Sequence, residues 1–245
     1  MTTLLLEDKI SVAIKIIEKE IDGCDKIGAD MNDDYCSAAE NLNWAFKKVL
    51  PKTRTYHGIS KMAIVVPESY YVIKVPFNGS WDSYYNEDED IYEDYWQEFQ
   101  YANPENYSFD YCCDELDKYE RAVSAGLGMF FAETLFYGYT KGGYPLYLQE
   151  KVRPDSDLCR ADTPKAKENS LTFVKNKREK DYNWKRLPEE WLAMAVDKYG
   201  SKLVERFIDF INNEEPEISE DLHGGNYGYR YDGSPVLLDF SGWRD

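Results

Sequence analysis

The 245-residue chain lacks the features that mark membrane proteins, secreted proteins and zinc-stabilised domains. It has no run of 18 apolar residues, so no membrane-spanning helix is expected, and its start, MTTLLLEDK, becomes acidic too early for a signal peptide. The five cysteines have no metal-site spacing and only two histidines are present, which argues against structural zinc. These absences predict a soluble protein of a reducing, cytoplasmic compartment.

Positive charge is also scarce. The 46 acidic residues outnumber the 29 basic ones, and a net charge of −17 repels phosphate, which argues against direct binding to nucleic acid. Residues 81–110 contain ten acidic residues, ten aromatic residues and no lysine or arginine, whereas residues 160–186 contain nine basic and four acidic residues. We interpret both segments as insertions or elaborated connections. The basic segment is expected to be a surface loop, with binding of an acidic substrate as the alternative.

Hydrophobic residues make up 43% of the chain, which is enough for one large domain or two small lobes. The first 50 residues predict two helices: isoleucines recur at helical spacing before Gly23, and a second apolar stripe ends at Pro51. We interpret residues 1–50 as an N-terminal helical extension. We expect its helices to stand in for parts that are missing from a short helical lobe formed by the C-terminal half of the chain.

The pattern then changes to short β-branched runs, which predict two hairpins. These runs cover residues 63–67, 70–76, 134–139 and 144–152. A helix is predicted between the hairpins, over residues 112–126, with its apolar stripe formed by Cys112, Leu116, Tyr119 and Val123.

Helical patterns return at residues 188–198 and 201–212, before a polar loop and a last hairpin around Asp232-Gly233. This order of elements predicts an α+β fold in two lobes. We expect residues 51–152 to form the small antiparallel sheet lobe, with the acidic insert 81–110, and residues 153–245 to form a truncated helical lobe.

The polar loop carries the most informative motif, Asp221-Leu222-His223-Gly224-Gly225-Asn226, and the last hairpin is followed by Asp239-Phe240-Ser241. Here the sequence resembles the protein-kinase-like superfamily. Asp221 and Asn226 have the spacing of the catalytic-loop pattern H-R-D-x-x-x-x-N, and Asp239 stands where the D of D-F-G belongs. The resemblance implies that Asp221 orients or deprotonates the acceptor hydroxyl. It also implies that Asn226 and Asp239 hold Mg²⁺ or Mn²⁺, and that His223 is a structural hydrogen-bonding residue.

An upstream lysine fits the same resemblance. Val72-Ile73-Lys74-Val75 resembles V-A-I-K, and strand alternation places Lys74 on the face opposite to Ile73 and Val75. The resemblance assigns Lys74 to the α- and β-phosphates of ATP and pairs it with a glutamate of the next helix. Glu115 and Glu120 are the candidates, and we prefer Glu115, which is expected to face the sheet.

The remaining nucleotide contacts depart from the pattern. A G-x-G-x-x-G run is absent, and the backbone of Ser60 and Lys61, after the single Gly58, is expected to cover the phosphates. The strand that ends at residue 149 leads to Glu150 and Val152, whose backbone the resemblance assigns to adenine.

The form D-L-H-x-G-N is similar to aminoglycoside and choline kinases and to short phage and bacterial kinases. Glu220 replaces the arginine before the catalytic aspartate, and the chain ends four residues after Ser241 without an activation segment. It therefore most resembles the short serine/threonine protein kinases of podophages and bacteria. The resemblance implies a reduced two-lobed kinase fold, ATP and magnesium as cofactors, and a host protein or the chain itself as the phosphate acceptor.

Two alternatives stay open. The first is a small-molecule kinase of the aminoglycoside or choline type. The second is a catalytically silent kinase scaffold whose acidic residues 81–110 imitate nucleic acid and bind a basic protein partner. The joint presence of Lys74, Asp221, Asn226 and Asp239 favours an active enzyme over a silent scaffold.

Overall fold

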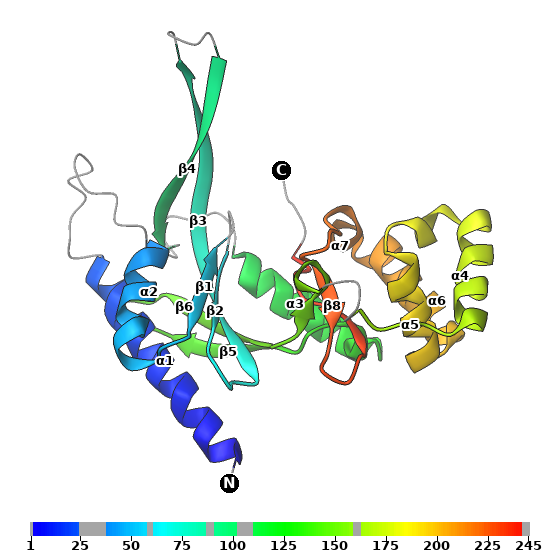
Figure 1. Cartoon of the computed structure of the whole chain (residues 1–245), viewed down its shortest axis with the longest axis horizontal. Coiled ribbons are helices and arrows are strands. Elements are labelled where there is room, and N and C mark those ends of the chain that lie inside the picture. The colour runs from blue at the N-terminus through cyan, green and yellow to red at the C-terminus, as the bar shows by residue number, and fades with distance from the viewer. Residues whose placement is uncertain are drawn as a thin grey trace. The chain divides into compact units, whose positions relative to one another are not determined.

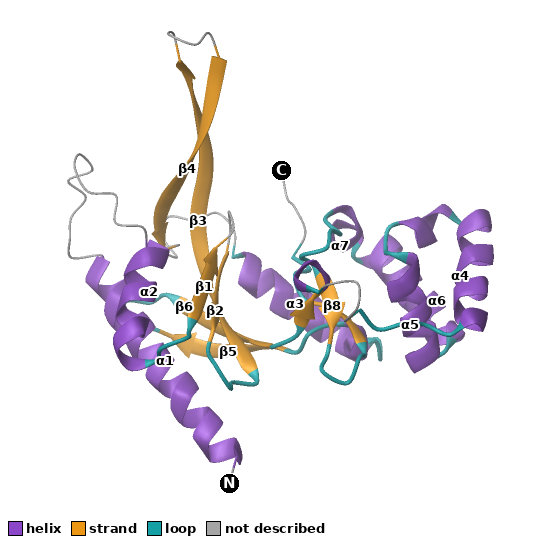
Figure 2. Cartoon of the chain, viewed as in Figure 1, coloured by secondary structure: helices purple, strands orange, loops and turns teal. Residues whose placement is uncertain are grey.

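The chain divides into two units, each with its own hydrophobic core. The computed structural model describes residues 2–24, 38–57, 61–86, 91–101, 110–158 and 163–241. Unit 1 consists of Met1–Cys113 and Leu135–Gln149, and unit 2 of Asp114–Thr134 and Glu150–Asp245. Helices and strands occur in both units (Figure 2), so the chain has the predicted mixture of α and β structure.

Unit 1 is built on a sheet whose strands run in the order β1-β2-β3-β6-β5, with β4 paired to β3 outside this path. The strands are β1 (Arg54–His57), β2 (Lys61–Val65), β3 (Tyr71–Asn86), β4 (Ile91–Tyr101), β5 (Thr134–Tyr139) and β6 (Pro145–Glu150). Antiparallel pairing of β2 with β3 confirms the hairpin predicted around Glu68. Glu68 itself has a φ of 60°, the left-handed conformation that such a tight turn requires.

Two helices, α1 (Thr2–Cys24) and α2 (Ala38–Val49), are packed with this sheet in one core. The predicted isoleucine stripe of α1 is buried together with Leu42 and Phe46 of α2. The sheet contributes Met62, Ile64, Val66, Ile73, Val75, Tyr144 and Leu146 to the same cluster. This corrects the expectation that these helices replace part of a helical lobe: periodicity identifies a buried face, but does not show which element covers it.

The isoleucine stripe makes a clear stability prediction. Ile17 is fully buried, so Ile17→Ala is expected to lower the free energy of unfolding by about 2–5 kcal/mol through lost burial and a residual cavity. Val49→Ala is the matched control on α2, because Val49 is 55% exposed. Urea unfolding measures both variants, and equal midpoints would contradict the placement of α1 in the core.

The acidic segment begins within a long β-ribbon. Strand β3 continues far beyond the five residues of β2 and pairs with β4 as a two-stranded projection (Figure 1). Trp81 lies opposite Trp96, and Tyr85 lies opposite Tyr92. Residues 87–90 and 102–109 of the segment lie outside the described residues.

Unit 2 is mainly helical and contains a small sheet of order β7-β8-β9. Its helices are α3 (Tyr111–Ser124), which begins in unit 1, α4 (Glu168–Lys180), α5 (Glu189–Tyr199), α6 (Ser201–Asp209) and α7 (Pro216–Glu220); its strands are β7 (Arg153–Pro154), β8 (Tyr227–Tyr229) and β9 (Pro235–Leu237). Helices α5 and α6 and the hairpin β8–β9 confirm the corresponding predictions. No described helix of either unit is long and apolar enough to cross a membrane.

The basic segment 160–186 is a helix over much of its length rather than the expected loop. Its cations pair with acids that follow it in sequence: Arg178 lies 3.8 Å from Glu189, and Lys177 pairs with Glu205. The basic side chains of α4 therefore form ion pairs that link this helix to α5 and α6. Composition alone predicted a loop because it does not reveal these partners.

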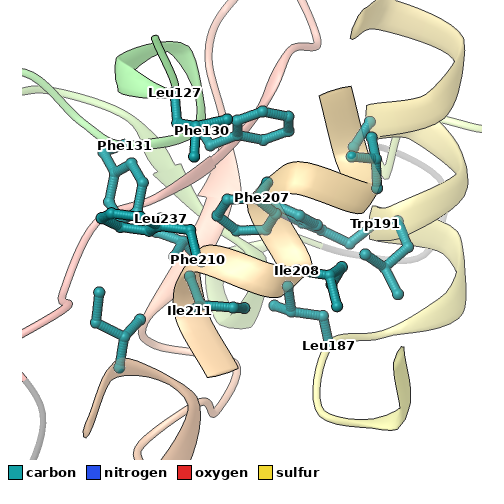
Figure 3. Close-up of a cluster of buried hydrophobic side chains, with 14 of the residues drawn as sticks. Leu127, Phe130, Phe131, Leu187, Trp191, Phe207, Ile208, Phe210, Ile211 and Leu237 are labelled. Carbon is teal, nitrogen blue, oxygen red and sulfur yellow. The ribbon is translucent and has the colours of Figure 1, made fainter. Parts of the chain in front are cut away.

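An aromatic core holds unit 2 together (Figure 3). Phe207 of α6 stacks on Phe130 with ring centroids 4.3 Å apart, and Phe131 contacts Phe240 at 5.1 Å. Phe131 also forms a β-bridge with Leu237. The core thus fixes the end of β9 and the residues that follow it.

Candidate active site

The polar loop between α7 and β8 folds around Asn226, which is 3% exposed. Its Nδ2 donates to the backbone carbonyl of Asp221 at 2.5 Å and to the Asp221 carboxylate at 3.2 Å. Its backbone N–H donates to the carbonyl of His223 at 2.8 Å. An amide that donates through its nitrogen presents its oxygen as an acceptor or metal ligand, so the loop holds two oxygen-bearing side chains together.

The β8–β9 hairpin brings Asp239 back to this loop. Tyr227 pairs with Leu237, and the backbone carbonyl of Asn226 accepts hydrogen bonds from the N–H groups of Leu238 at 3.0 Å and Asp239 at 3.5 Å. Asn226 and Asp239 are 13 residues apart in sequence and are neighbours in the fold, as the hairpin predicted.

Asp221, Asn226 and Asp239 together offer two carboxylates and an amide. Hard oxygen ligands of this kind suit Mg²⁺, which binds few protein side chains and keeps other positions for water and phosphate. Among the described residues, no group of three His, Cys, Asp or Glu side chains is arranged to hold a metal. The candidate set contains only two such side chains, Asp221 and Asp239, because its third member is the Asn226 amide.

His223 is tied to the backbone of its own loop. Its Nδ1 accepts a hydrogen bond from the N–H of Gly225 at 3.1 Å, which places the proton of a neutral ring on Nε2. A Cβ atom at Gly225 would lie 3.0 Å from Cε1 of His223, so glycine allows this close approach. This geometry suits the structural role expected for His223.

Helix α3 follows its prediction in part, because Cys112 of the predicted stripe is fully buried. Val123, expected on the buried stripe, is 50% exposed. Three charged side chains, Asp114, Glu115 and Lys118, are instead 6%, 0% and 1% exposed. Buried charges are rare because desolvation is costly, and they require partners. An apolar pattern could not reveal this face.

Two partners of this charged face lie in the segment after Asp239. Glu115 Oε1 accepts a hydrogen bond from the N–H of Phe240 at 3.4 Å, and Lys118 Nζ donates to the carbonyl of Ser241. Glu120 is exposed. Of the two candidate glutamates, Glu115 is therefore the one that contacts the Asp239 segment. Its pairing with Lys74 joins residues of two units and stays a prediction.

Lys74 lies on β3 of unit 1, opposite Ala63 of β2, and is 6% exposed. Its neighbours Ile73 and Val75 belong to the core shared with α1 and α2, so Lys74 occupies the other face of the strand. Lys61, at the start of β2, is 9% exposed. Ser60 lies outside the described residues.

Glu150 has a structural partner that sequence reasoning missed. Its carboxylate forms a two-point pair with Arg230, from Nε at 2.8 Å and from the terminal nitrogen at 2.9 Å, and its N–H donates to the carbonyl of Glu133 at 2.7 Å. Burial lowers the pKa of Arg230, but the hydrogen bonds with Glu150 and the electrostatic attraction of Glu150, Tyr199 and Asp232 together outweigh it and raise the pKa overall.

This arrangement narrows the predicted adenine contacts. The N–H of Glu150 donates to Glu133 within unit 2, so this donor is not offered to adenine, and Val152 is half-buried. The sequence showed Arg230 only as an arginine next to the turn of the last hairpin, and gave no indication of its pairing with Glu150.

Comparisons of the chain with known protein families, with curated proteins and with solved structures find no match. The site is therefore interpreted from its own residues and geometry.

Proposed function

We propose that the protein is an ATP- and Mg²⁺-dependent phosphotransferase with a reduced protein-kinase-like fold, acting on serine or threonine of a protein. The observation that carries this proposal is the convergence of Asp221, Asn226 and Asp239 on one loop and one hairpin of unit 2. Phosphoryl transfer requires a positioned carboxylate and a held metal ion, and these three side chains are of the types that supply both.

Each residue has a role that its position permits. The Asp221 carboxylate orients the acceptor hydroxyl and takes its proton as the oxygen bonds to the γ-phosphorus and the bond to ADP breaks. Asn226 Oδ1 and the Asp239 carboxylate would hold magnesium, which when bound would supply positive charge against the phosphates of ATP. Lys74 supplies a cation for the α- and β-phosphates, and the buried Glu115 is its proposed partner.

The acceptor class follows from the resemblance to short serine/threonine kinases, and a small molecule is the alternative acceptor. The long β3–β4 ribbon favours a second candidate function, because it presents the acidic and aromatic sequence on a projecting structure. In that function the chain binds a basic protein surface through residues 81–110 without catalysis.

The test is the intact mass of the pure protein after incubation with ATP and Mg²⁺ or Mn²⁺, with thermal unfolding measured in the same buffers. Asp239→Ala is expected to abolish phosphotransfer, by about 10³-fold or more, because it removes a metal ligand from a charge-stabilised transition state. Asp209→Ala is the matched control, since Asp209 is an exposed aspartate on α6, and it should leave the rate unchanged.

Three outcomes separate the candidates. Added phosphate in the wild type and Asp209→Ala, but not in Asp239→Ala, supports a protein kinase. A thermal shift with ATP and metal but no added phosphate supports a kinase whose acceptor was missing. Absence of both signals overturns the kinase proposal and favours the acidic binding protein.

A further inference from the structure

Lys118 is the most deeply buried lysine among the described residues, at 1% exposure. Its Nζ lies 2.7 Å from Oδ2 of Asp114, one turn earlier on α3, and donates to the backbone carbonyl of Ser241. It also lies 4.0 Å from the carboxylate of Glu217 on α7. One ammonium group therefore contacts both chain segments that carry the candidate site: α7 precedes Asp221, and Ser241 follows Asp239.

Helix α3 holds the segment after Asp239 through a backbone N–H group and through a backbone carbonyl group. Glu115 accepts from the N–H of Phe240, and Lys118 donates to the carbonyl of Ser241. On the other side, the N–H of Asp239 is directed to the carbonyl of Asn226. The backbone on each side of the Asp239 side chain is thus held by hydrogen bonds.

Stability alone does not account for this arrangement. A buried ion pair gains little over apolar residues of similar volume, because desolvation offsets its Coulomb attraction. An apolar side chain at position 118 would fill the same space without desolvation cost, but would offer no donor to the Ser241 carbonyl. The property that the lysine provides and an apolar residue does not is a hydrogen-bond donor that holds the Ser241 carbonyl.

We infer that Lys118 is a positioning residue of the phosphotransfer site: it holds the segment that carries the metal ligand Asp239 against the segment that carries Asp221. This inference rests on the proposed function. Asp114 in turn balances the charge of Lys118. Lys118 itself touches neither substrate nor metal.

The test compares Lys118→Met with the double variant Asp114→Asn/Lys118→Met, which removes both charges. Lys118→Met leaves Asp114 buried without its cation and is expected to be unstable, whereas the double variant should recover stability. In the double variant, the Mg²⁺ concentration for half-maximal phosphotransfer should rise roughly 10- to 100-fold, the usual effect of losing a residue that orients a metal ligand. Lys177→Met, which breaks the surface pair with Glu205, is the control and should leave the Mg²⁺ requirement unchanged.

Hydrogen exchange of the amides of residues 239–241 gives a readout that does not depend on catalysis. Faster exchange in the double variant is expected, because the Ser241 carbonyl has lost its donor. Unchanged exchange, or an unchanged Mg²⁺ requirement in a stable and active double variant, overturns the role of Lys118 and leaves the proposed function standing. Faster exchange in a chain whose wild type shows neither added phosphate nor a thermal shift with ATP and metal keeps the contact but refutes the proposed function, and with it the catalytic part of this inference.

Discussion

Replacing Asp221 with asparagine is expected to slow phosphotransfer by about 10²- to 10⁴-fold, the range that a positioned general base contributes. Asparagine has nearly the same shape, and its side-chain oxygen can still accept the hydrogen bond that Asn226 Nδ2 donates at 3.2 Å. The loop should therefore stay folded, and ATP should bind as before. The rate of transfer and the thermal shift with ATP and Mg²⁺ measure these two properties separately.

Glu220→Gln is the matched control for Asp221→Asn. Glu220 is the adjacent carboxylate and is exposed at the end of α7. The variant loses the same charge at the neighbouring position of the chain, so a purely long-range electrostatic effect would slow both variants alike. Equal losses in the two variants, or a full rate in Asp221→Asn, would contradict the assignment of Asp221 as the base.

The loop and hairpin of the candidate site could be predicted because their geometry depends on residues that are close together in the sequence. A turn at Asp232-Gly233 between two apolar runs predicts a hairpin, and a hairpin brings its two ends together whatever surrounds it. Asn226 and Asp239 lie at those ends. Loop residues that hydrogen-bond their own backbone, as His223 does through Gly225, belong to the same class of local information.

The charged face of α3 could not be predicted, because its partners are far away in sequence. Asp114 and Lys118 have the i, i+4 spacing of an ordinary surface ion pair on a helix. Only the folded structure shows that this pair is buried and that Lys118 contacts Ser241, 123 residues later in the sequence. Apolar periodicity correctly identified Cys112, which is buried, and Tyr119, which packs against the core of unit 2, but it could not indicate the buried charges beside them.

The roles of Arg230 and of α1 were missed for the same physical reason. Arg230 pairs with Glu150 across 80 residues, and no local pattern distinguishes such a pair from two solvated side chains. The isoleucines of α1 were correctly expected to be buried, but the sheet that covers them follows much later in the sequence. Tertiary partners decide which element completes a core.

Trp191→Ala is expected to be the most destabilising single substitution discussed, at about 3–5 kcal/mol. Trp191 of α5 is fully buried in the aromatic core of unit 2, where its ring centroid lies 5.9 Å from that of Phe207 (Figure 3). Its Nε1 also donates to the carbonyl of Gly228 in β8 at 3.2 Å. Because Gly228 lies two residues after Asn226, the indole links the core to the candidate loop. Urea unfolding followed by circular dichroism measures the loss.

Two further variants separate the contributions of the indole. Trp191→Phe keeps most of the apolar ring but removes the N–H, so it should lose about 0.5–1.5 kcal/mol for the hydrogen bond, in addition to a smaller packing loss. Trp44→Ala removes a tryptophan that is 62% exposed on α2 and should change the free energy of unfolding by less than about 0.5 kcal/mol. If Trp191→Ala were no more destabilising than Trp44→Ala, the aromatic core of unit 2 would not be what holds β8 and the loop in place. If Trp191→Phe matched Trp191→Ala, the hydrogen bond to Gly228, rather than ring packing, would be the main contribution of this residue.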